Sequence, residues 1–114
     1  AMESPGEPSA AIRERVMAAR AIQAARYRDM PGVHTNAEAR SRDLVDICRF
    51  SQKERDYLVR VIERLRLSAR AYDKVLRVAR TIADLAGSAD VLPEHLDNAL
   101  FYRRMDSEEN SFWI

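Results

Sequence analysis

One stretch decides the fold: LSARAYDKVLRVARTIADLAG, residues 67–87. Its apolar residues recur at steps of three and four, which is the spacing of one face of an α-helix. They are Tyr72, Val75, Leu76, Ala79, Ile82, Ala83 and Ala86. Ser68 stands at the position of an N-cap, and Gly87 stands where a helix ends. The spacing therefore predicts a buried-face helix over residues 69–86.

The polar residues of this segment are aligned as well. At about 100° per residue, five of them fall within about 40° of one line, opposite the face centred on Ala79. They are Arg70, Lys74, Arg77, Thr81 and Asp84. Arg70 belongs to the first turn, where free N–H groups and the positive end of the helix dipole favour an anion. Arg70 is therefore a candidate ligand for a phosphate or carboxylate.

A structural alternative explains the same polar line. Its members can be solvated side chains that form intrahelical pairs, such as Arg80 with Asp84 and Arg77 with Thr81. Each such pair stabilises a helix by at most about 0.5 kcal/mol. The spacing alone leaves both interpretations open.

Outward from this segment, the sequence predicts four more helices. They are expected over residues 9–28, over 42–49, from the Ser51–Glu54 capping box to Leu65, and from Pro93 to a frayed end at Arg103–Arg104. The first carries a buried stripe of Ile12, Val16, Ala19, Gln23, Tyr27 and Met30. No segment has the pattern of a strand. The expected architecture is all-α, a compact bundle of four to five helices.

The chain divides into three parts by composition. Residues 1–8 are expected to be a tag remnant and linker, and residues 9–104 the helical domain. Residues 105–114 form a tail with three acids that ends in Phe-Trp-Ile. Such an ending is unusual for a solvated segment, so we expect the tail either to dock on a neighbour or to be disordered.

The counts restrict the function. The 114 residues hold 17 Arg and two Lys against 18 acids, a net charge of +1, which argues against a domain that wraps a polyanion. No apolar run approaches the ~20 residues that cross a bilayer, and no signal peptide is seen, so we expect a cytoplasmic protein without a membrane partner.

The sequence also shows no motif for catalysis or metal binding. The three glycines are isolated, so no phosphate-binding loop is present and the chain alone should not hydrolyse nucleotide. Cys48 has no neighbouring histidine and lies on an apolar helix face, which favours a buried structural thiol. His34 and His95 are too far apart in sequence to suggest a metal site.

Residues 67–87 resemble the C-terminal region of the magnesium-chelatase-like ComM/YifB family of AAA+ ATPases. Further blocks agree with the family in the same order. These blocks are Gly6-Glu7-Pro8-Ser9 with Ile12 to Val16, Asn36-Ala37, Cys48, Glu94-His95-Leu96, and Tyr102-Arg103. The resemblance covers about residues 6–106.

The resemblance implies that the chain is the helical lid of such an ATPase, without the core that binds most of the nucleotide. Arg70 then matches the "sensor 2" arginine, which faces the terminal phosphate of ATP. Arg77 is a second, weaker candidate for nucleotide contact, and Arg77 and Arg80 are expected at an interface with the core or the adjacent subunit. ATP and Mg²⁺ are expected mainly on the absent core, and none on this domain alone.

The family also implies partners. They are the N-terminal AAA+ core of the same chain, adjacent subunits of a homo-oligomeric, hexameric ring, and DNA through the whole assembly. The implied activity of the parent is ATP-driven DNA branch migration in natural transformation.

Two residues depart from the family pattern. Arg66 stands where Gly or Asn commonly ends the third helix, and a left-handed arginine there costs about 1 kcal/mol. The helix could therefore end differently and shift the approach of Arg70. Leu92 stands where Ser or Thr often caps the fifth helix, so that start is expected to fray or shift.

Two other functions stay open from the sequence. A small DNA-binding module would use Arg13, Arg20 and Arg28, or Arg60 and Arg64, as phosphate contacts. A protein-interaction bundle would use the aromatic tail.

Overall fold

The computed structural model describes the backbone of residues 9–113 and the side chains of residues 9–103. The expected linker, residues 1–8, and Ile114 lie outside the described residues. Five α-helices and two short 3-10 helices make up the described fold. They are α1 Ser9–Arg26, η1 Asn36–Glu38, η2 Ser41–Asp43, α2 Leu44–Cys48, α3 Gln52–Leu65, α4 Ala69–Leu85 and α5 Pro93–Trp113. The described residues contain no strand, and the all-α expectation is confirmed.

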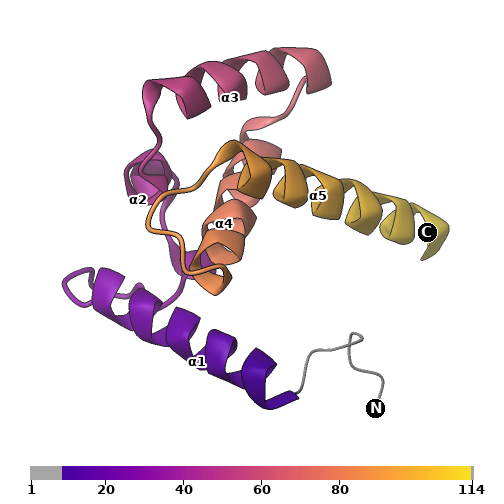
Figure 1. Cartoon of the computed structure of the whole chain (residues 1–114). Coiled ribbons are helices and arrows are strands. Elements are labelled where there is room, and N and C mark those ends of the chain that lie inside the picture. Colours follow the sequence, from indigo (N-terminus) through magenta and orange to yellow (C-terminus); the bar gives the residue numbers. More distant parts are fainter. Residues whose placement is uncertain (1–8, 114) are drawn as a thin grey trace.

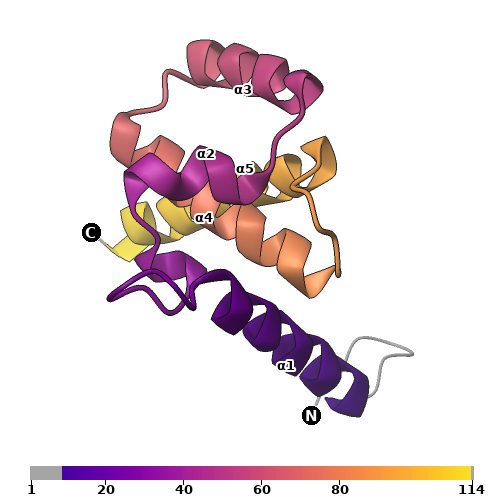
Figure 2. The same ribbon diagram turned by 90° about the vertical axis from the view of Figure 1, so that its left-hand side faces the viewer.

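Helix α4 is the centre of the molecule, and α1, α2, α5 and η1 pack around it (Figures 1 and 2). Its predicted apolar face supplies the middle of the core. The buried hydrophobic residues are Ala19, Tyr27, Val33, Ala39, Leu44, Ile47, Cys48, Phe50, Leu58, Val75, Leu76, Ala79, Ala83, Val91, Leu96 and Ala99. Burying such a face on several neighbours is what makes a single helix the organising element of a small bundle.

Helix α3 contributes few residues to the core. Of its residues only Glu54 and Leu58 are buried, and the hydroxyl of Tyr57 ties it to α5 by donating to Asp97. Leu65, at the end of this helix, is 50% exposed. Figure 1 shows α3 on the far side of α4 from α1.

The predicted helix ends are largely present. The Ser68 hydroxyl accepts the N–H of Ala71 at 3.1 Å and caps α4. At the other end Gly87 has a φ of +72° and Ser88 donates its N–H to the Ala83 carbonyl at 2.8 Å. This is the glycine-dependent ending that the sequence predicts. In the capping box before α3, the N–H of Ser51 donates to Glu54 at 3.0 Å.

Arg66 does adopt the left-handed conformation, with a φ of +51°, so α3 ends in a left-handed cap despite the arginine. Arg49 at the end of α2 has a φ of +55°. The expectation of a shifted end to α3 was wrong, because the N–H of Leu67 still closes the turn on the Ile62 carbonyl at 3.3 Å.

The start of α5 neither frays nor shifts. The helix begins at Pro93, and the Nδ1 atom of His95 accepts the N–H of Leu92 at 2.9 Å. A side chain three residues into the helix thus does what glutamate does in a capping box. The expectation from Leu92 was wrong because it considered only the cap residue and not the residue that reaches back to it.

Three helix bounds differ from the prediction. Helix α1 ends at Arg26, α2 is shortened by the preceding η2, and α5 extends to Trp113. The predicted end at Arg103–Arg104 was wrong because no Gly or Pro follows before residue 114 to stop the helix. The side chains of the predicted tail lie outside the described residues.

Candidate functional site

The N-terminal end of α4 carries the first candidate site. Arg70 lies in the first turn, and its side chain is exposed. Among the described residues, no hydrogen bond or ion pair engages its guanidinium group. The Ser68 hydroxyl caps only one of the first-turn N–H groups, so others remain at a helix end that favours negative charge. The arrangement can bind an oxyanion such as a phosphate.

The polar line along α4 changes character after two turns. Arg70 and Lys74 are exposed, whereas Arg77 is half-buried and donates to the carbonyl of Ala39 through Nε at 3.1 Å and Nη2 at 2.9 Å. Seven residues advance an α-helix by about 10 Å, so Arg77 does not adjoin Arg70. Through this contact with Ala39, Arg77 holds the segment between η1 and η2 against α4.

Arg80 is completely buried, with 0% of its surface exposed. Its Nη1 donates to the carbonyls of Ile47 and Ala89, each at 2.9 Å, and its Nη2 donates to the carbonyl of Ser88 at 2.8 Å. It thereby ties the end of α2 to the loop after α4. The expected interface role of Arg80 was wrong, because these contacts enclose the side chain within its own domain.

Asp84 is the acidic partner at this end of α4. It receives a two-pronged contact from Arg26, at 2.8 and 2.7 Å, and an ion pair from Arg80 at 3.1 Å. The amide of Asn36 donates to it at 2.9 Å. Burial opposes ionisation of Asp84, but the donors Arg26 and Asn36 and the charge of Arg80 outweigh it and lower its pKa. The carboxylate is therefore held charged inside the protein.

Asn36 connects this group to α1. Its Oδ1 accepts the hydroxyl of Tyr27 at 2.6 Å and Nη1 of Arg26 at 3.0 Å, and its backbone N–H donates to Gln23 at 2.9 Å. We call Arg26, Tyr27, Asn36, Arg80 and Asp84 the Asp84 cluster. The predicted Arg80–Asp84 pair is confirmed, but it is buried rather than solvated. For the other members of the cluster, the sequence held one indication: Gln23 is a polar residue in an otherwise apolar stripe.

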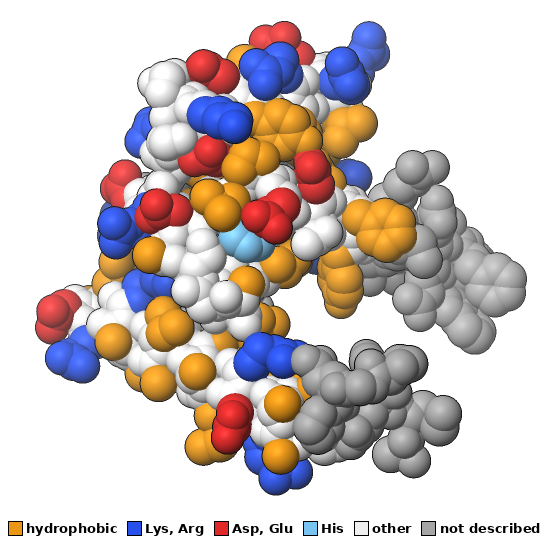
Figure 3. Space-filling model, in the orientation of Figure 1, with side chains coloured by type: hydrophobic (Ala, Val, Ile, Leu, Met, Phe, Trp, Pro, Cys, Tyr) orange, Lys and Arg blue, Asp and Glu red, His pale blue; other side chains and the backbone are white. Residues whose placement is uncertain are grey.

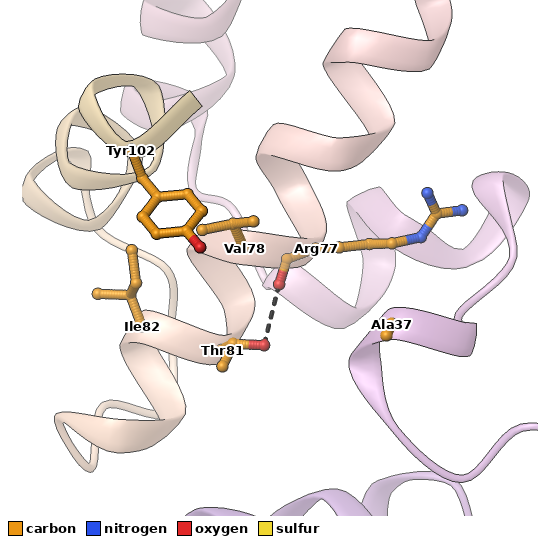
Figure 4. A pocket seen from close by; sticks show the side chains of 6 residues that line it. All are labelled: Ala37, Arg77, Val78, Thr81, Ile82 and Tyr102. Carbon is orange, nitrogen blue, oxygen red and sulfur yellow. Dashed lines mark hydrogen bonds between the residues drawn. The ribbon is translucent and has the colours of Figure 1, made fainter. Parts of the chain in front are cut away.

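A hollow of about 340 Å³ opens between η1, α4 and α5. Figure 4 shows Tyr102, Val78 and Ile82 on one side of it and Arg77 with Ala37 on the other. The hydroxyl of Thr81 donates to the backbone carbonyl of Arg77 at 3.1 Å. We call this hollow the Tyr102 pocket; its walls are mostly apolar.

The remaining candidate residues from the sequence are Cys48 and His34. Cys48 is buried, its Sγ lies 3.7 Å from the Leu76 carbonyl, and burial raises its pKa to about 12, so the thiol is structural as predicted. His34 is exposed in the loop before η1. In residues 9–103, no group of three His, Cys, Asp or Glu is arranged to hold a metal ion. Within the described range no helix is long and apolar enough to cross a membrane.

The arginines of the DNA-binding alternative do not form one surface. Arg13, Arg20 and Arg28 are exposed on or just after α1, and Arg60 and Arg64 are exposed on α3. These two helices lie on opposite sides of α4 in both ribbon views (Figures 1 and 2). On the face drawn in Figure 3, basic and acidic side chains are interspersed. A single recognition surface is therefore not formed on this face or by these five residues.

Comparison with known proteins gives a consistent match. The family described as magnesium chelatase, subunit ChlI C-terminal, matches residues 6–103. Competence protein ComM of Haemophilus influenzae is 39% identical over 100 residues, which are 88% of this chain and 19% of that protein. The protein YifB of Escherichia coli is 37% identical over 102 residues, 90% of this chain and 19% of YifB. The chain thus spans 19% of the length of these curated relatives.

Proposed function

The chain belongs to the magnesium chelatase, subunit ChlI C-terminal family, and on this premise we propose that it is the helical lid of an AAA+ ATPase of the ComM/YifB type. In this proposal Arg70 is the sensor 2 arginine and meets the terminal phosphate of ATP. The observation that carries the proposal is the exposed, unengaged guanidinium of Arg70 in the first turn of a capped helix.

The chemistry of Arg70 follows from its fork of donors. A guanidinium group can give two parallel N–H bonds to a phosphate and stays charged at any physiological pH. It would stabilise charge on the terminal phosphate, and the first-turn N–H groups of α4 would add to this. ATP supplies the group that is transferred to water, and Mg²⁺ with the phosphate loop belongs to the core outside this chain. The domain alone is not the catalyst.

The other end of α4 supports coupling of nucleotide to motion. The Asp84 cluster fastens α4 to α1 and η1, and Arg80 fastens it to α2. A helix held in this way moves with its neighbours as one body. A phosphate that binds Arg70 would therefore shift most of the lid, and loss of the phosphate would let the lid move back.

The proposal extends to the parent protein. We propose a cytoplasmic, hexameric ring that uses ATP for DNA branch migration, in line with the name of the ComM relative, a competence protein. The partners are the AAA+ core of the same chain, the adjacent subunit and DNA. Arg77 is proposed at the interface with the core or the adjacent subunit, because it is only half-buried.

The test uses the full-length protein that carries this domain. We expect Arg70→Ala to lower ATP turnover at least about tenfold, or to uncouple turnover from nucleotide binding, because a charge contact to the reacting phosphate is lost. The matched control is Arg60→Ala, which removes an exposed arginine from α3 and should leave turnover unchanged. Wild-type turnover and coupling in Arg70→Ala would refute the sensor 2 role. The isolated 114-residue chain is expected to show no ATPase activity.

A further inference from the structure

The Tyr102 pocket is an apolar hollow with an exposed aromatic ring in its wall. Tyr102 is 59% exposed, although it lies on the helix that packs most against α4. A large, exposed aromatic side chain in the wall of a hollow of about 340 Å³ is typical of a surface that binds a partner.

The side chains around the Tyr102 pocket indicate which kind of segment would bind there. The inner walls, from Val78, Ile82 and Tyr102, suit an aromatic or aliphatic side chain. The positive charge of Arg77 lies on the opposite wall, and the exposed Arg70 continues the basic line along α4. A complementary segment would carry bulky apolar residues next to acidic ones.

The chain itself contains such a segment. Residues 106–114 hold Asp106, Glu108 and Glu109, followed after Asn110 and Ser111 by Phe112-Trp113-Ile114. No other part of the sequence places three acids within four residues and three bulky apolar residues together after them. We propose that residues 106–114 of a second copy of this chain dock here, with the aromatic residues in the Tyr102 pocket and the acids along the basic line of α4.

A second copy is required by the length of α5. The helix runs unbroken from Pro93 to Trp113, and its end projects beyond the rest of the molecule (Figure 1). Trp113 follows Tyr102 by 11 residues, which is about 16 Å along the helix axis. A segment that continues a helix away from its own pocket cannot turn back into it, but it can reach the pocket of a neighbour. This contact does not depend on the proposed lid function.

The experiment uses Trp113, which is the chain's single tryptophan. Its fluorescence is recorded over a dilution series of the 114-residue chain, with sedimentation velocity in parallel. We expect emission typical of a buried indole in the concentrated, associated chain and of an exposed indole in the dilute monomer. Exposed-type emission at all concentrations, or buried-type emission that does not change on dilution, would overturn docking on a second copy.

The pocket is tested by a charge at its wall. Ile82→Lys should weaken self-association at least about tenfold, because a lysine would have to be buried against the aromatic residues. The matched control is Val59→Lys on α3, where the side chain is 53% exposed and outside the pocket. Circular dichroism checks that both variants are folded. Association that survives Ile82→Lys with wild-type strength would overturn the assignment of the pocket.

A competition experiment needs no pocket variant. A synthetic peptide of residues 105–114 with Trp113→Phe has no tryptophan of its own and should displace the tail. We expect it to return the chain to monomers and Trp113 to exposed-type emission. A peptide in which Phe112, Trp113 and Ile114 are all replaced by Ser should have no such effect. Failure of the first peptide, or equal competition by both, would overturn the proposal.

Discussion

Arg70 and Arg80 are the same residue type on the same helix, ten residues apart, and they differ in every property that decides a role. Arg70 is exposed in the first turn of α4, and its guanidinium forms no hydrogen bond or ion pair with a described residue. Arg80 is 0% exposed, donates to three backbone carbonyls and pairs with Asp84. The difference shows that the two ends of α4 do separate work: one presents a charge, and the other fastens the helix.

The cause of the difference lies outside α4. The loop with η1 and the end of α1 cover the C-terminal half of the polar line, and Arg26 and Asn36 reach Asp84 from there. Near the N-terminus of α4, by contrast, Arg70 and Lys74 are exposed. We expect substitutions at the covered end to alter stability and substitutions at the open end to alter function.

The largest effect is expected from Asp84→Ala. It leaves Arg26 and Arg80 without their shared counter-charge, and breaking a buried ion pair costs about 3–5 kcal/mol of unfolding free energy. Urea unfolding followed by circular dichroism measures it. Asp73→Ala, in the N-terminal half of the same helix, is the control and should change stability by less than about 0.5 kcal/mol. Equal losses in both variants would remove the distinction between the two ends.

Acid should weaken the covered end through the same carboxylate. The pKa of Asp84 is lowered below its usual 3.8 in the folded chain, so its contribution to stability is complete above 3.8 and is lost as the pH falls through the folded-state pKa. Each unit of pKa difference corresponds to about 1.4 kcal/mol. Unfolding free energies measured at several acid pH values should fall more steeply for the wild type than for Asp84→Asn. Parallel slopes would show that another group causes the acid sensitivity.

A smaller change of the opposite sign is expected at the entrance to α4. Arg66→Gly removes the cost of an arginine with a φ of +51°, and stability should rise by about 1 kcal/mol. Thermal unfolding compared with Arg64→Gly, two residues earlier in helical backbone, separates the two positions, since glycine there should lower stability by about 1 kcal/mol. A loss in both variants would mean that the left-handed cap is not strained.

The smallest effect on stability is expected at Arg70. Because its side chain is exposed and forms no hydrogen bond or ion pair with a described residue, Arg70→Ala should change the unfolding free energy by less than about 0.5 kcal/mol. Differential scanning calorimetry of the 114-residue chain measures this. A loss of 2 kcal/mol or more, a size typical of buried interactions, would place Arg70 among the structural residues with Arg80.

The sequence predicted the fold well because the fold depends on local patterns. The apolar spacing in α4, the Ser51–Glu54 capping box and Gly87 each act within a few residues, and all three are present in the structure. The end of α5 and the cap role of His95 were missed. No residue punctuates the end of α5, and His95 takes a capping role that histidine rarely signals in a sequence.

The site was predicted only in part because burial depends on distant residues. The helical line correctly grouped Arg70 with Asp84 in angle, but it could not show that Asn36, 48 residues before Asp84, would meet that carboxylate. Arg26 was overlooked among the five arginines in and after α1 for the same reason. The role of Arg80 was misjudged because an arginine on a helix is usually taken to be exposed.

The most direct test is ATP turnover by the full-length protein in which Arg70 is replaced by Ala. The preparation used must have the unfolding temperature of the wild type. We predict turnover at least about tenfold below the wild type, because the open end of α4 presents the charge that meets the terminal phosphate. Wild-type turnover in that correctly folded variant would contradict the account.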